Sequence, residues 1–563
     1  MNPGQPGSLD NSSDEDDEIL SYLREQDSTK EADRFRISRC EERQYYPLSS
    51  GQQRLWFLDQ IEPGNPAYHY QFRLLFGGSF HKDALTRALN ELIRRHDVLR
   101  ARFAVHDLEL VQFIAPATSF EPQFVDLSGR QGETREREER ELVTRLNQDP
   151  FDLSEGPLVR SLLIRREAEV HLLLMCLHHI VTDRWSMDVF VRELDALYAA
   201  FSAGGSSPLE EMPIQYTDYA VWERESQKGE TYQGSLEYWR LQLADLTTLA
   251  LPMDRPRPAI RDFGSDKVVV TLPPLICGKV RQFAKAGGAT SFMAYLTGFA
   301  VALSRLTGQV DIVVGTPISN RNLPELEALI GYFTNTLVLR LDLSGDPSAS
   351  ELLGRVREVL LDAYRYQDVP FETLVEKLAP KRDLSRSPLF QVLFVHLGGG
   401  APQPQENVAA PRNRPVLSQP DKVSADYDLE IYVAEEPEET IVSFHFRTDI
   451  FDHATVARLV GNYARILLGL APGPEPRIGG IALLDVEQRL RMIEVGRGPS
   501  TALPERCVHR MIEEVAGRTP DAIAVEAGDE RLGYGALNAR ANRLARRLRE
   551  MGVGPGTLVG VCV

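Results

Sequence analysis

The chain has 563 residues and a formal net charge of −18 at pH 7. At about 150 residues per folding unit, this length predicts three or four units, and the 43% hydrophobic content is typical of a globular protein. The acidic charge argues against nucleic acids and anionic membranes as main partners. No apolar run reaches the roughly 18 residues of a membrane span, and no secretion signal opens the chain. Scattered cysteines without a CxxC pair indicate a reducing cytoplasm and no zinc site.

Composition divides the chain into five stretches. Residues 1–43 are an acidic tail, in which Asp14–Glu18 carries no basic residue. Such tails are usually solvated, so this one is either an unstructured leader or a short docking segment for a partner protein. Mixed strands and helices are predicted over 44–225 and again over 226–488. A linker at 489–505 leads into 506–563, which we interpret as the truncated start of a further domain.

Hydrophobic periodicity predicts the main elements in chain order. Helices are expected at Lys82–Arg95, Glu133–Leu146, Met187–Ala200, Ser291–Leu306, Ala349–Tyr366 and Tyr534–Glu550. Strands are expected at Val170–Leu177, Val268–Leu272 and Val310–Gly315, and a β pattern begins at Val553–Val563. The mixture indicates an α/β fold, in which the strongly apolar run Val170–Leu177 is a buried strand.

Two adjacent histidines follow that buried strand. His178 and His179 stand at its end, and Asp183 comes four residues after His179. Loops at strand ends present catalytic groups in α/β folds, and an imidazole takes up a proton near neutral pH. On spacing alone, a packed pair of core histidines is an equal alternative. A metal site is disfavoured because there is no His-Glu-x-x-His motif, and the chain has no nucleophile elbow, Walker loop or dinucleotide fingerprint.

The segment His178–Arg184 resembles the HHxxxDG motif of nonribosomal peptide synthetase condensation domains, which are related to chloramphenicol acetyltransferase. Six further stretches look like core motifs of that family in the family's order: Pro47–Leu58, Arg95–Phe103, Tyr216–Trp222, Ile330–Thr336, Tyr366–Glu372 and Arg382–Leu389. The resemblance covers about 45–488. Residues 518–525 and 532–548 look like the opening of an adenylation domain, whose phosphate loop and catalytic lysine are absent. Amino-acid activation by this chain is therefore not expected.

The resemblance implies a fold of two chloramphenicol acetyltransferase-like lobes in a V-shaped pseudo-dimer, with a tunnel at their junction. Partner carrier proteins would bring a donor acyl thioester and an acceptor aminoacyl thioester on 4'-phosphopantetheine arms, and the chain itself would bind no cofactor. Amide formation from a thioester is downhill, so the catalyst mainly aligns two tethered groups. The implied setting is cytoplasmic biosynthesis of natural-product peptides, antibiotics among them.

The resemblance also assigns roles to residues. His179 is expected to carry catalysis, either by removing the ammonium proton or by holding the amine and stabilising the tetrahedral intermediate. His178 is expected to pack or hydrogen-bond behind the strand. Asp183 is expected to pair with an arginine, which by resemblance is Arg321, and to hold the loop. The remaining loop-bracing candidates are Arg184, Trp185 and Ser186, and the tunnel candidates are Asn335 and Tyr332.

Arg184 departs from the family pattern, which has glycine at this position. Glycine permits close approach and unusual φ angles, whereas arginine fills space and adds charge. Arg184 is therefore either a tolerated surface variant, or a residue that narrows the acceptor side or contacts a phosphate or carboxyl group.

The donor is expected to arrive in trans, since Met1 opens the chain and no carrier domain precedes the condensation unit. An upstream synthetase or a polyketide synthase carrier would supply it, with residues 1–43 as the docking segment. The acceptor would be the downstream carrier protein that accompanies the adenylation domain. The alternatives are a starter domain that uses acyl-CoA, a catalytically silent recruitment domain, an epimerase and an ester-forming enzyme.

Overall fold

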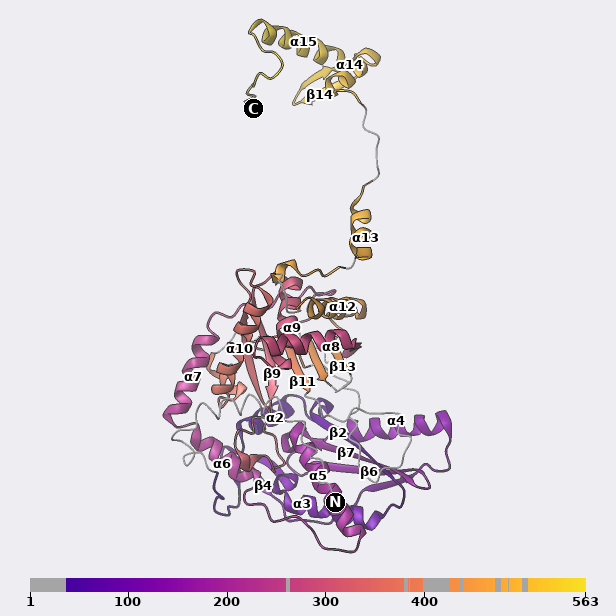
Figure 1. Ribbon diagram of the computed structural model, residues 1–563, viewed down its shortest axis with the longest axis vertical. Coiled ribbons are helices and arrows are strands. Elements are labelled where there is room, and N and C mark those ends of the chain that lie inside the picture. The colour runs from indigo at the N-terminus through magenta and orange to yellow at the C-terminus, as the bar shows by residue number, and fades with distance from the viewer. Residues whose placement is uncertain are drawn as a thin grey trace, which may run out of the picture. The chain divides into compact units, whose positions relative to one another are not determined.

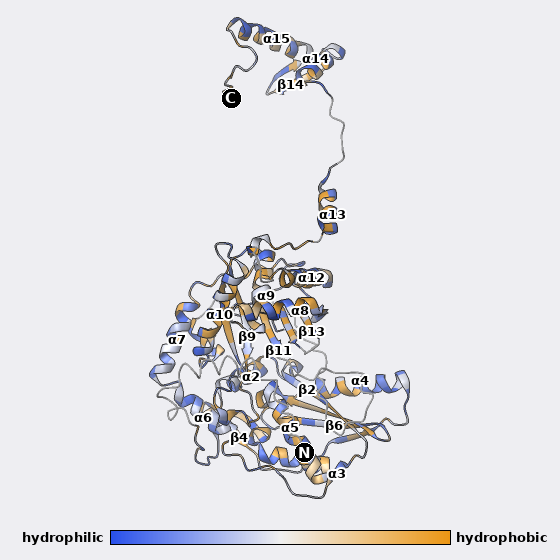
Figure 2. Cartoon of the chain, in the orientation of Figure 1, coloured by the Kyte–Doolittle hydropathy of each residue, from blue (hydrophilic) through white to orange (hydrophobic). Residues whose placement is uncertain are grey.

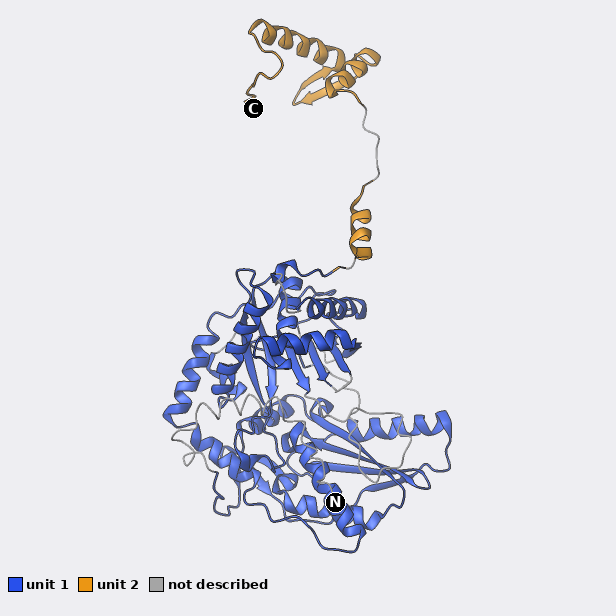
Figure 3. Ribbon diagram, viewed as in Figure 1, with its two compact units in different colours: residues 1–483 blue, residues 484–563 orange. Residues whose placement is uncertain are grey.

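The computed structural model describes residues 37–259, 264–378, 383, 385–397, 426–435, 439–470, 477–484, 486–498 and 505–562. Most of the predicted acidic tail, including Asp14–Glu18, therefore lies outside the described residues. The chain divides into two compact units, residues 1–483 and 484–563 (Figure 3). The first unit contains two hydrophobic cores with separate sheets, which we name the N-terminal and C-terminal lobes (Figure 1).

The N-terminal lobe contains a four-stranded sheet of order β2-β7-β6-β5 and a three-stranded sheet of order β1-β4-β3. Its elements are β1 (Tyr46–Pro47), α2 (Ser50–Ile61), β2 (His69–Gly77), α3 (Lys82–Arg95), β3 (Ala101–His106), β4 (Glu109–Ile114), β5 (Gln123–Asp126), α4 (Gly132–Gln148), β6 (Val159–Glu167), β7 (Val170–His178), α5 (Arg184–Ser202), α6 (Tyr216–Ser226) and α7 (Glu230–Gln242).

Strand β7 is the centre of this lobe. It pairs antiparallel with β2 on one side and β6 on the other, and its residues 171–178 are all buried. A strand that is covered on both faces has no polar alternation, which explains its continuous apolar sequence. Helix α3 buries Leu85, Leu89 and Leu92 at helical spacing and packs beside α5. Because β7 is paired on both edges and buried, its last residue, His178, lies inside the lobe.

The C-terminal lobe contains a six-stranded sheet of order β10-β9-β11-β12-β13-β8. Its elements are β8 (Ser265–Leu272), α8 (Pro274–Ala286), α9 (Ser291–Thr307), β9 (Asp311–Ile318), β10 (Asn335–Asp342), α10 (Ala349–Arg365), α11 (Phe371–Leu378), β11 (Val392–Leu397), β12 (Leu429–Glu435), β13 (Thr440–Arg447) and α12 (His453–Gly469). Residues 292–303 of α9 are all buried, and α9 packs against α8, α10 and α12. Figure 2 shows hydrophobic residues concentrated along the strands of both lobes.

One segment of the C-terminal lobe enters the core of the other lobe. Residues 319–334 leave β9 and return in β10, whose first residue Asn335 is paired with Ile318. Between these points Leu326, Leu329 and Phe333 are buried in the N-terminal core. This crossing segment, residues 319–334, therefore carries Arg321 and Tyr332 to the loop that follows β7.

The second unit contains α13 (Val486–Gly496), α14 (Val508–Arg518), the hairpin of β14 (Ile523–Ala527) and β15 (Glu530–Gly533), and α15 (Tyr534–Glu550). The predicted helices are present in both units, and their ends differ from the predicted ends by up to three residues. The strand expected at Val553–Val563 is wrong, because the described residues 553–562 contain none. A strand needs a neighbour to pair its backbone groups, and no described strand pairs with this stretch.

Helix α13 begins at Val486, inside the stretch predicted as the C-terminal lobe, and extends into the predicted linker at 489–505. The domain boundaries drawn from the sequence remain predictions. Among the described residues, no single helix is long and apolar enough to cross a membrane. Helices α8 and α9, which meet at a bend of 107°, are long and apolar enough for a membrane span only when they are taken together.

Candidate functional site

The candidate site is the loop between β7 and α5. A 3-10 turn at His179–Val181 follows the strand, and α5 begins at Arg184 because Asp183 caps it. The Oδ1 atom of Asp183 accepts the backbone N–H of Ser186 at 2.8 Å, which satisfies one of the free donors of the first helical turn. The loop is thus fixed at both ends by secondary structure.

His178 points into the core behind the strand. Its side chain is 2% exposed, and Nδ1 accepts the backbone N–H of Ile180 at 3.1 Å. The rings of His69 and Phe151 lie 6.0 Å from its ring. Burial, followed by the neighbouring His69 and His179, lowers the pKa of His178 to about 3. His178 therefore stays neutral at physiological pH and has a structural environment.

A hydrogen bond to the backbone orients the ring of His179. Its Nδ1 lies 2.6 Å from the carbonyl oxygen of Thr182. Because a carbonyl oxygen only accepts, Nδ1 carries the proton and Nε2 keeps its lone pair. Burial lowers the pKa of His179, while the Thr182 carbonyl and the Asp183 carboxylate oppose that shift. The neutral imidazole is thus an acceptor at Nε2 and can act as a general base.

Two tyrosine rings enclose the imidazole of His179. The ring of Tyr70, in β2, lies 5.6 Å away, and the ring of Tyr332, in the crossing segment, lies 5.1 Å away, both edge-on. Burial raises the pKa of both phenols, so both remain neutral. The imidazole therefore sits between one residue from each lobe, at the junction.

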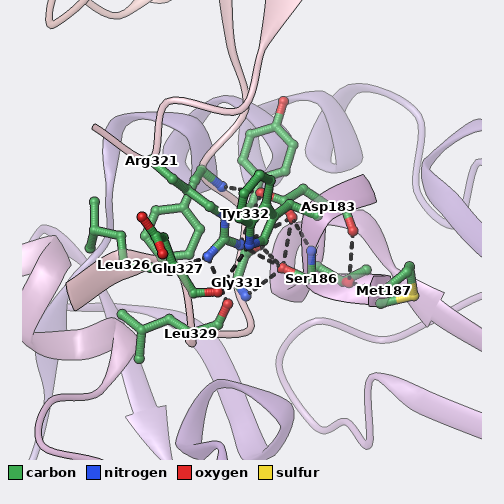
Figure 4. A network of polar contacts seen from close by, with 12 residues as sticks. Asp183, Ser186, Met187, Arg321, Leu326, Glu327, Leu329, Gly331 and Tyr332 are labelled. Atoms are coloured by element: carbon green, nitrogen blue, oxygen red, sulfur yellow. Dashed lines mark hydrogen bonds and ion pairs between the residues drawn. The ribbon is translucent and has the colours of Figure 1, made fainter. Parts of the chain in front are cut away.

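Asp183 and Arg321 form a buried ion pair across this junction (Figure 4). Arg321 Nη2 is 3.2 Å from Asp183 Oδ1, and the other carboxylate oxygen accepts the backbone N–H of Phe333 at 3.0 Å. Arg321 Nη1 also donates to the carbonyl oxygens of Leu326 and Leu329. A buried charge needs this many partners to offset the loss of water. The pair therefore ties the loop after β7 to the crossing segment.

Ser186 and Trp185 add further ties to the crossing segment. Ser186 Oγ lies 2.7 Å from Asp183 Oδ1 and 2.8 Å from the carbonyl oxygen of Gly331, and it accepts the N–H of Gly331 at 3.0 Å. Trp185 Nε1 donates to the carbonyl oxygen of Glu327 at 2.9 Å. These contacts connect the first turn of α5 to residues 327–331 of the crossing segment.

Arg184 does not extend freely into solvent. Its Nη1 atom is 2.9 Å from Asp188 Oδ1, one helical turn along α5, and its side chain is 31% exposed. Burial acts to lower the pKa of Arg184, but Tyr70 and Asp188 together raise it above the usual value. The guanidinium is thus charged, paired and close to Tyr70, which itself contacts His179.

Tyr332 is fixed by close contacts with the N-terminal lobe. Its carbonyl oxygen accepts the hydroxyl of Tyr216 at 2.5 Å, and that hydroxyl lies 2.8 Å from Ser49 Oγ. A Cβ atom on Gly51 would lie 2.6 Å from the Tyr332 ring, and one on Gly331 would overlap the Tyr216 ring. Glycine is therefore required sterically at both positions.

Asn335 braces the C-terminal lobe at the same junction. Its Nδ2 donates to the carbonyl oxygens of Gln367 and Val369, and its Oδ1 accepts the N–H of Phe371 at 3.0 Å. It also lines a small polar pocket together with Ser49, Glu223, Tyr332, Asp368 and Glu372. The amide is thus engaged with the backbone, which indicates a bracing position beside the pocket.

Some residues of the junction were not singled out from the sequence. Arg54, in α2, is 3.1 Å from Glu372, in α11, and its guanidinium lies 5.7 Å from the Phe371 ring. Tyr70 contacts His179, as described above. Arg54 and Glu372 lie inside the family-like motif stretches Pro47–Leu58 and Tyr366–Glu372, which could have pointed to them in the sequence. Tyr70 lies in β2, outside every such stretch, so no motif pointed to it. Their proximity depends on the packing of the lobes.

Comparison with known proteins places the chain in a family. Residues 42–493 match the Condensation domain family, and residues 512–563 match the AMP-binding enzyme family. Malpinin synthetase of Mortierella alpina is 38% identical over 547 residues, which are 97% of this chain and 7% of that protein. Phosphinothricin tripeptide synthetase PhsC of Streptomyces viridochromogenes is 37% identical over 520 residues, 92% of this chain and 48% of that protein. The chain spans less than half of these relatives.

Solved structures share the fold of the chain. The X-domain from teicoplanin biosynthesis has a TM-score of 0.70 and 28% identity, and the match covers 80% of this chain and 100% of that one. A four-domain nonribosomal peptide synthetase, bound to AMP and glycine, has a TM-score of 0.71 at 23% identity, over 93% of this chain and 40% of that one, which shows the fold alone. The family matches show that the chain belongs to the nonribosomal peptide synthetase condensation-domain family, and that the start of an AMP-binding adenylation domain follows.

Proposed function

We propose that the chain catalyses amide bond formation between a donor acyl thioester and the amine of an acceptor aminoacyl thioester. The observation that supports this most is the hydrogen bond that fixes the tautomer of the His179 imidazole. Its Nδ1 is committed to the Thr182 carbonyl, so a lone pair is available at Nε2 beside the lobe junction. The substrates would be tethered to carrier proteins through phosphopantetheine arms, which are parts of the partners.

His179 acts in this proposal as a general base. An acceptor that enters as an ammonium gives one proton to Nε2, and the free amine then adds to the donor carbonyl carbon to form the C–N bond. The C–S bond breaks as the tetrahedral intermediate collapses, and the thiolate takes up a proton. In total, an ammonium and a thioester give an amide, a thiol and one proton released to water. Tethering supplies the high effective concentration.

The two lobes are proposed to form a V with a tunnel at their junction, reached by the two carrier arms from opposite sides. The hydrogen bonds between the loop after β7 and the crossing segment support this, because they connect the neighbourhood of His179 to a segment that leaves the sheet of the C-terminal lobe. The donor is proposed to arrive in trans from an upstream synthetase or polyketide synthase carrier, and the acceptor from the downstream carrier. A starter reaction with acyl-CoA is the alternative donor source.

Intact-protein mass spectrometry of an aminoacyl-loaded acceptor carrier tests the proposal. The donor is offered either as acyl-CoA or on a carrier, with wild-type chain, His179→Ala, and His453→Ala as a matched control, since His453 is exposed and lies in α12. We expect a mass gain with wild type and control, and a loss of at least about 100-fold with His179→Ala. Equal gain with His179→Ala overturns the assigned role, and a gain only from acyl-CoA selects the starter reaction.

A second candidate function is recruitment of a partner enzyme without catalysis. One solved relative, the X-domain from teicoplanin biosynthesis, is also recorded in a complex with OxyB, with a TM-score of 0.68 and 28% identity to this chain. Absence of product from wild type with every donor, together with stable binding of a partner, would favour this function over condensation.

A further inference from the structure

The ring of Tyr332 is fixed beside the imidazole of His179. The two ring centres are 5.1 Å apart, and the ring planes meet at 86°. A Cβ atom on Gly51 would lie 2.6 Å from carbon atoms of the Tyr332 ring, so α2 packs directly against that ring. The backbone is held as well, because the carbonyl oxygen of Tyr332 accepts the Tyr216 hydroxyl at 2.5 Å and the N–H of the next residue donates to Asp183 at 3.0 Å. A side chain with this support keeps its position.

The hydroxyl of Tyr332 is an uncommitted hydrogen-bond donor. Burial raises the pKa of the phenol, so the hydroxyl keeps its proton near neutral pH. Although Tyr332 is only 9% exposed, none of the residues that the structure describes hydrogen-bonds its hydroxyl. Tyr332 lines the small polar pocket that Gly51 and Asn335 also line. A buried hydroxyl without a partner costs free energy, and a substrate group that accepts its hydrogen bond would offset this cost.

Several other polar side chains at the lobe junction already donate to acceptors within the protein. Trp185 Nε1 donates to a backbone carbonyl oxygen at 2.9 Å, and Asn335 Nδ2 donates to two such oxygens. Arg321 and Arg54 are each paired with a carboxylate, at 3.2 Å and 3.1 Å respectively. A substrate would have to break these interactions to use those donors, whereas the hydroxyl of Tyr332 is available without such a loss.

The proposed reaction develops negative charge close to His179. When the amine adds to the donor carbonyl, the carbonyl oxygen becomes an oxyanion that is bonded to the same carbon as the amine nitrogen. The base that serves this nitrogen and a donor that serves this oxygen must therefore be neighbours. His179 and Tyr332 meet this requirement, because their rings are in contact. In a site with little water, a donor held in position stabilises an oxyanion strongly.

We propose that Tyr332 is a catalytic residue of the condensation reaction, whose hydroxyl donates a hydrogen bond to the carbonyl oxygen of the donor thioester. The inference rests on the proposed function and assigns it a second residue, from the crossing segment. As the amine adds, the C=O double bond becomes a single bond and the oxygen takes the negative charge, while Tyr332 keeps its proton. When the C–S bond breaks, the double bond forms again and the thiolate leaves.

The test compares wild type with Tyr332→Phe, which removes only the hydroxyl and keeps the ring against Gly51. Tyr45→Phe is the matched control, since Tyr45 is 37% exposed and its ring contacts His106 and Phe113 in β3 and β4. The first readout is single-turnover amide formation over a range of donor concentrations. With Tyr332→Phe, we expect the rate at saturation to fall about 10- to 100-fold, because the hydrogen bond strengthens as the charge develops. The half-saturating concentration is expected to stay within about 3-fold, and Tyr45→Phe is expected to behave as wild type.

The second readout is the titration of His179 by NMR in the full chain labelled at histidine Cε1, with the signal assigned from His179→Gln. Tyr332→Phe is expected to leave this titration unchanged, since the neighbouring ring and the contact with the Thr182 carbonyl remain. A shifted titration would show that Tyr332 acts through the imidazole and overturns direct donation. An unchanged rate at saturation also overturns the inference, even if the half-saturating concentration rises. Absence of product from wild type overturns the proposed function instead.

Discussion

Arg321 and Asp183 lie 3.2 Å apart, and each side chain is 1% exposed. Arg321 belongs to the crossing segment, residues 319–334, whereas Asp183 caps α5 in the other lobe. The pair thus makes the geometry of the loop after β7 depend on both lobes. A charge left alone at this depth has no water to solvate it.

Arg321→Met is expected to lower the free energy of unfolding by roughly 3–5 kcal/mol, because it leaves Asp183 buried without its cation. Urea denaturation followed by circular dichroism measures this. Asp183→Asn combined with Arg321→Met should cost less than the sum of the two single variants, since both remove one interaction. Additive losses would show that the two side chains act independently.

The stability of the fold is expected to fall as the pH falls from 7 to 5, with a contribution from His178 of about 2 kcal/mol. The pKa of His178 is about 3 in the fold, against about 6.5 in an unfolded chain. Below about pH 6.5 the unfolded chain therefore binds a proton that the folded chain does not, and unfolding is favoured. Thermal melts of wild type and His178→Asn across this range measure the difference. Equal pH dependence in both would contradict the assignment.

Arg184→Gly is expected to change acceptor selectivity by at least about 3-fold, because the half-buried guanidinium fills space close to Tyr70, whose ring contacts His179. Competition between carriers loaded with glycine and with a bulky amino acid measures the ratio of products. Arg184→Lys, which keeps charge and length, is the control. An unchanged ratio in both variants would show Arg184 to be a tolerated substitution.

Gly331→Ala is expected to destabilise the fold by about 1–3 kcal/mol, since the new methyl group would overlap the Tyr216 ring and force it to move. Gly354→Ala, inside α10 with open space around it, is the matched control and should stabilise by about 0.5–1 kcal/mol. Chemical denaturation of both variants gives the comparison. Loss of stability only at Gly354 would contradict the predicted order.

Local features of the fold were readable from the sequence. The apolar run that became β7, the amphipathic α3 and the nearly continuously buried α9 appear as patterns of neighbouring residues. Their ends were less certain: α5 begins three residues before the predicted helix, because Asp183 caps it. The strand expected after Val553 failed for a related reason, since pairing depends on a partner that a local pattern does not contain.

The sequence alone determined which residue types gather around the candidate site, because the motif stretches contain His178, His179, Asp183 and Tyr332. Tertiary structure alone decided which of them touch. The crossing segment brings Tyr332 to the His179 ring, and β2 brings Tyr70 to the same ring. These contacts join residues separated by more than a hundred positions, which only the packing of two cores brings together. Burial at that junction lowers the pKa of both histidines. The spacing of residues in the sequence does not reveal burial, so only the tertiary structure decides this.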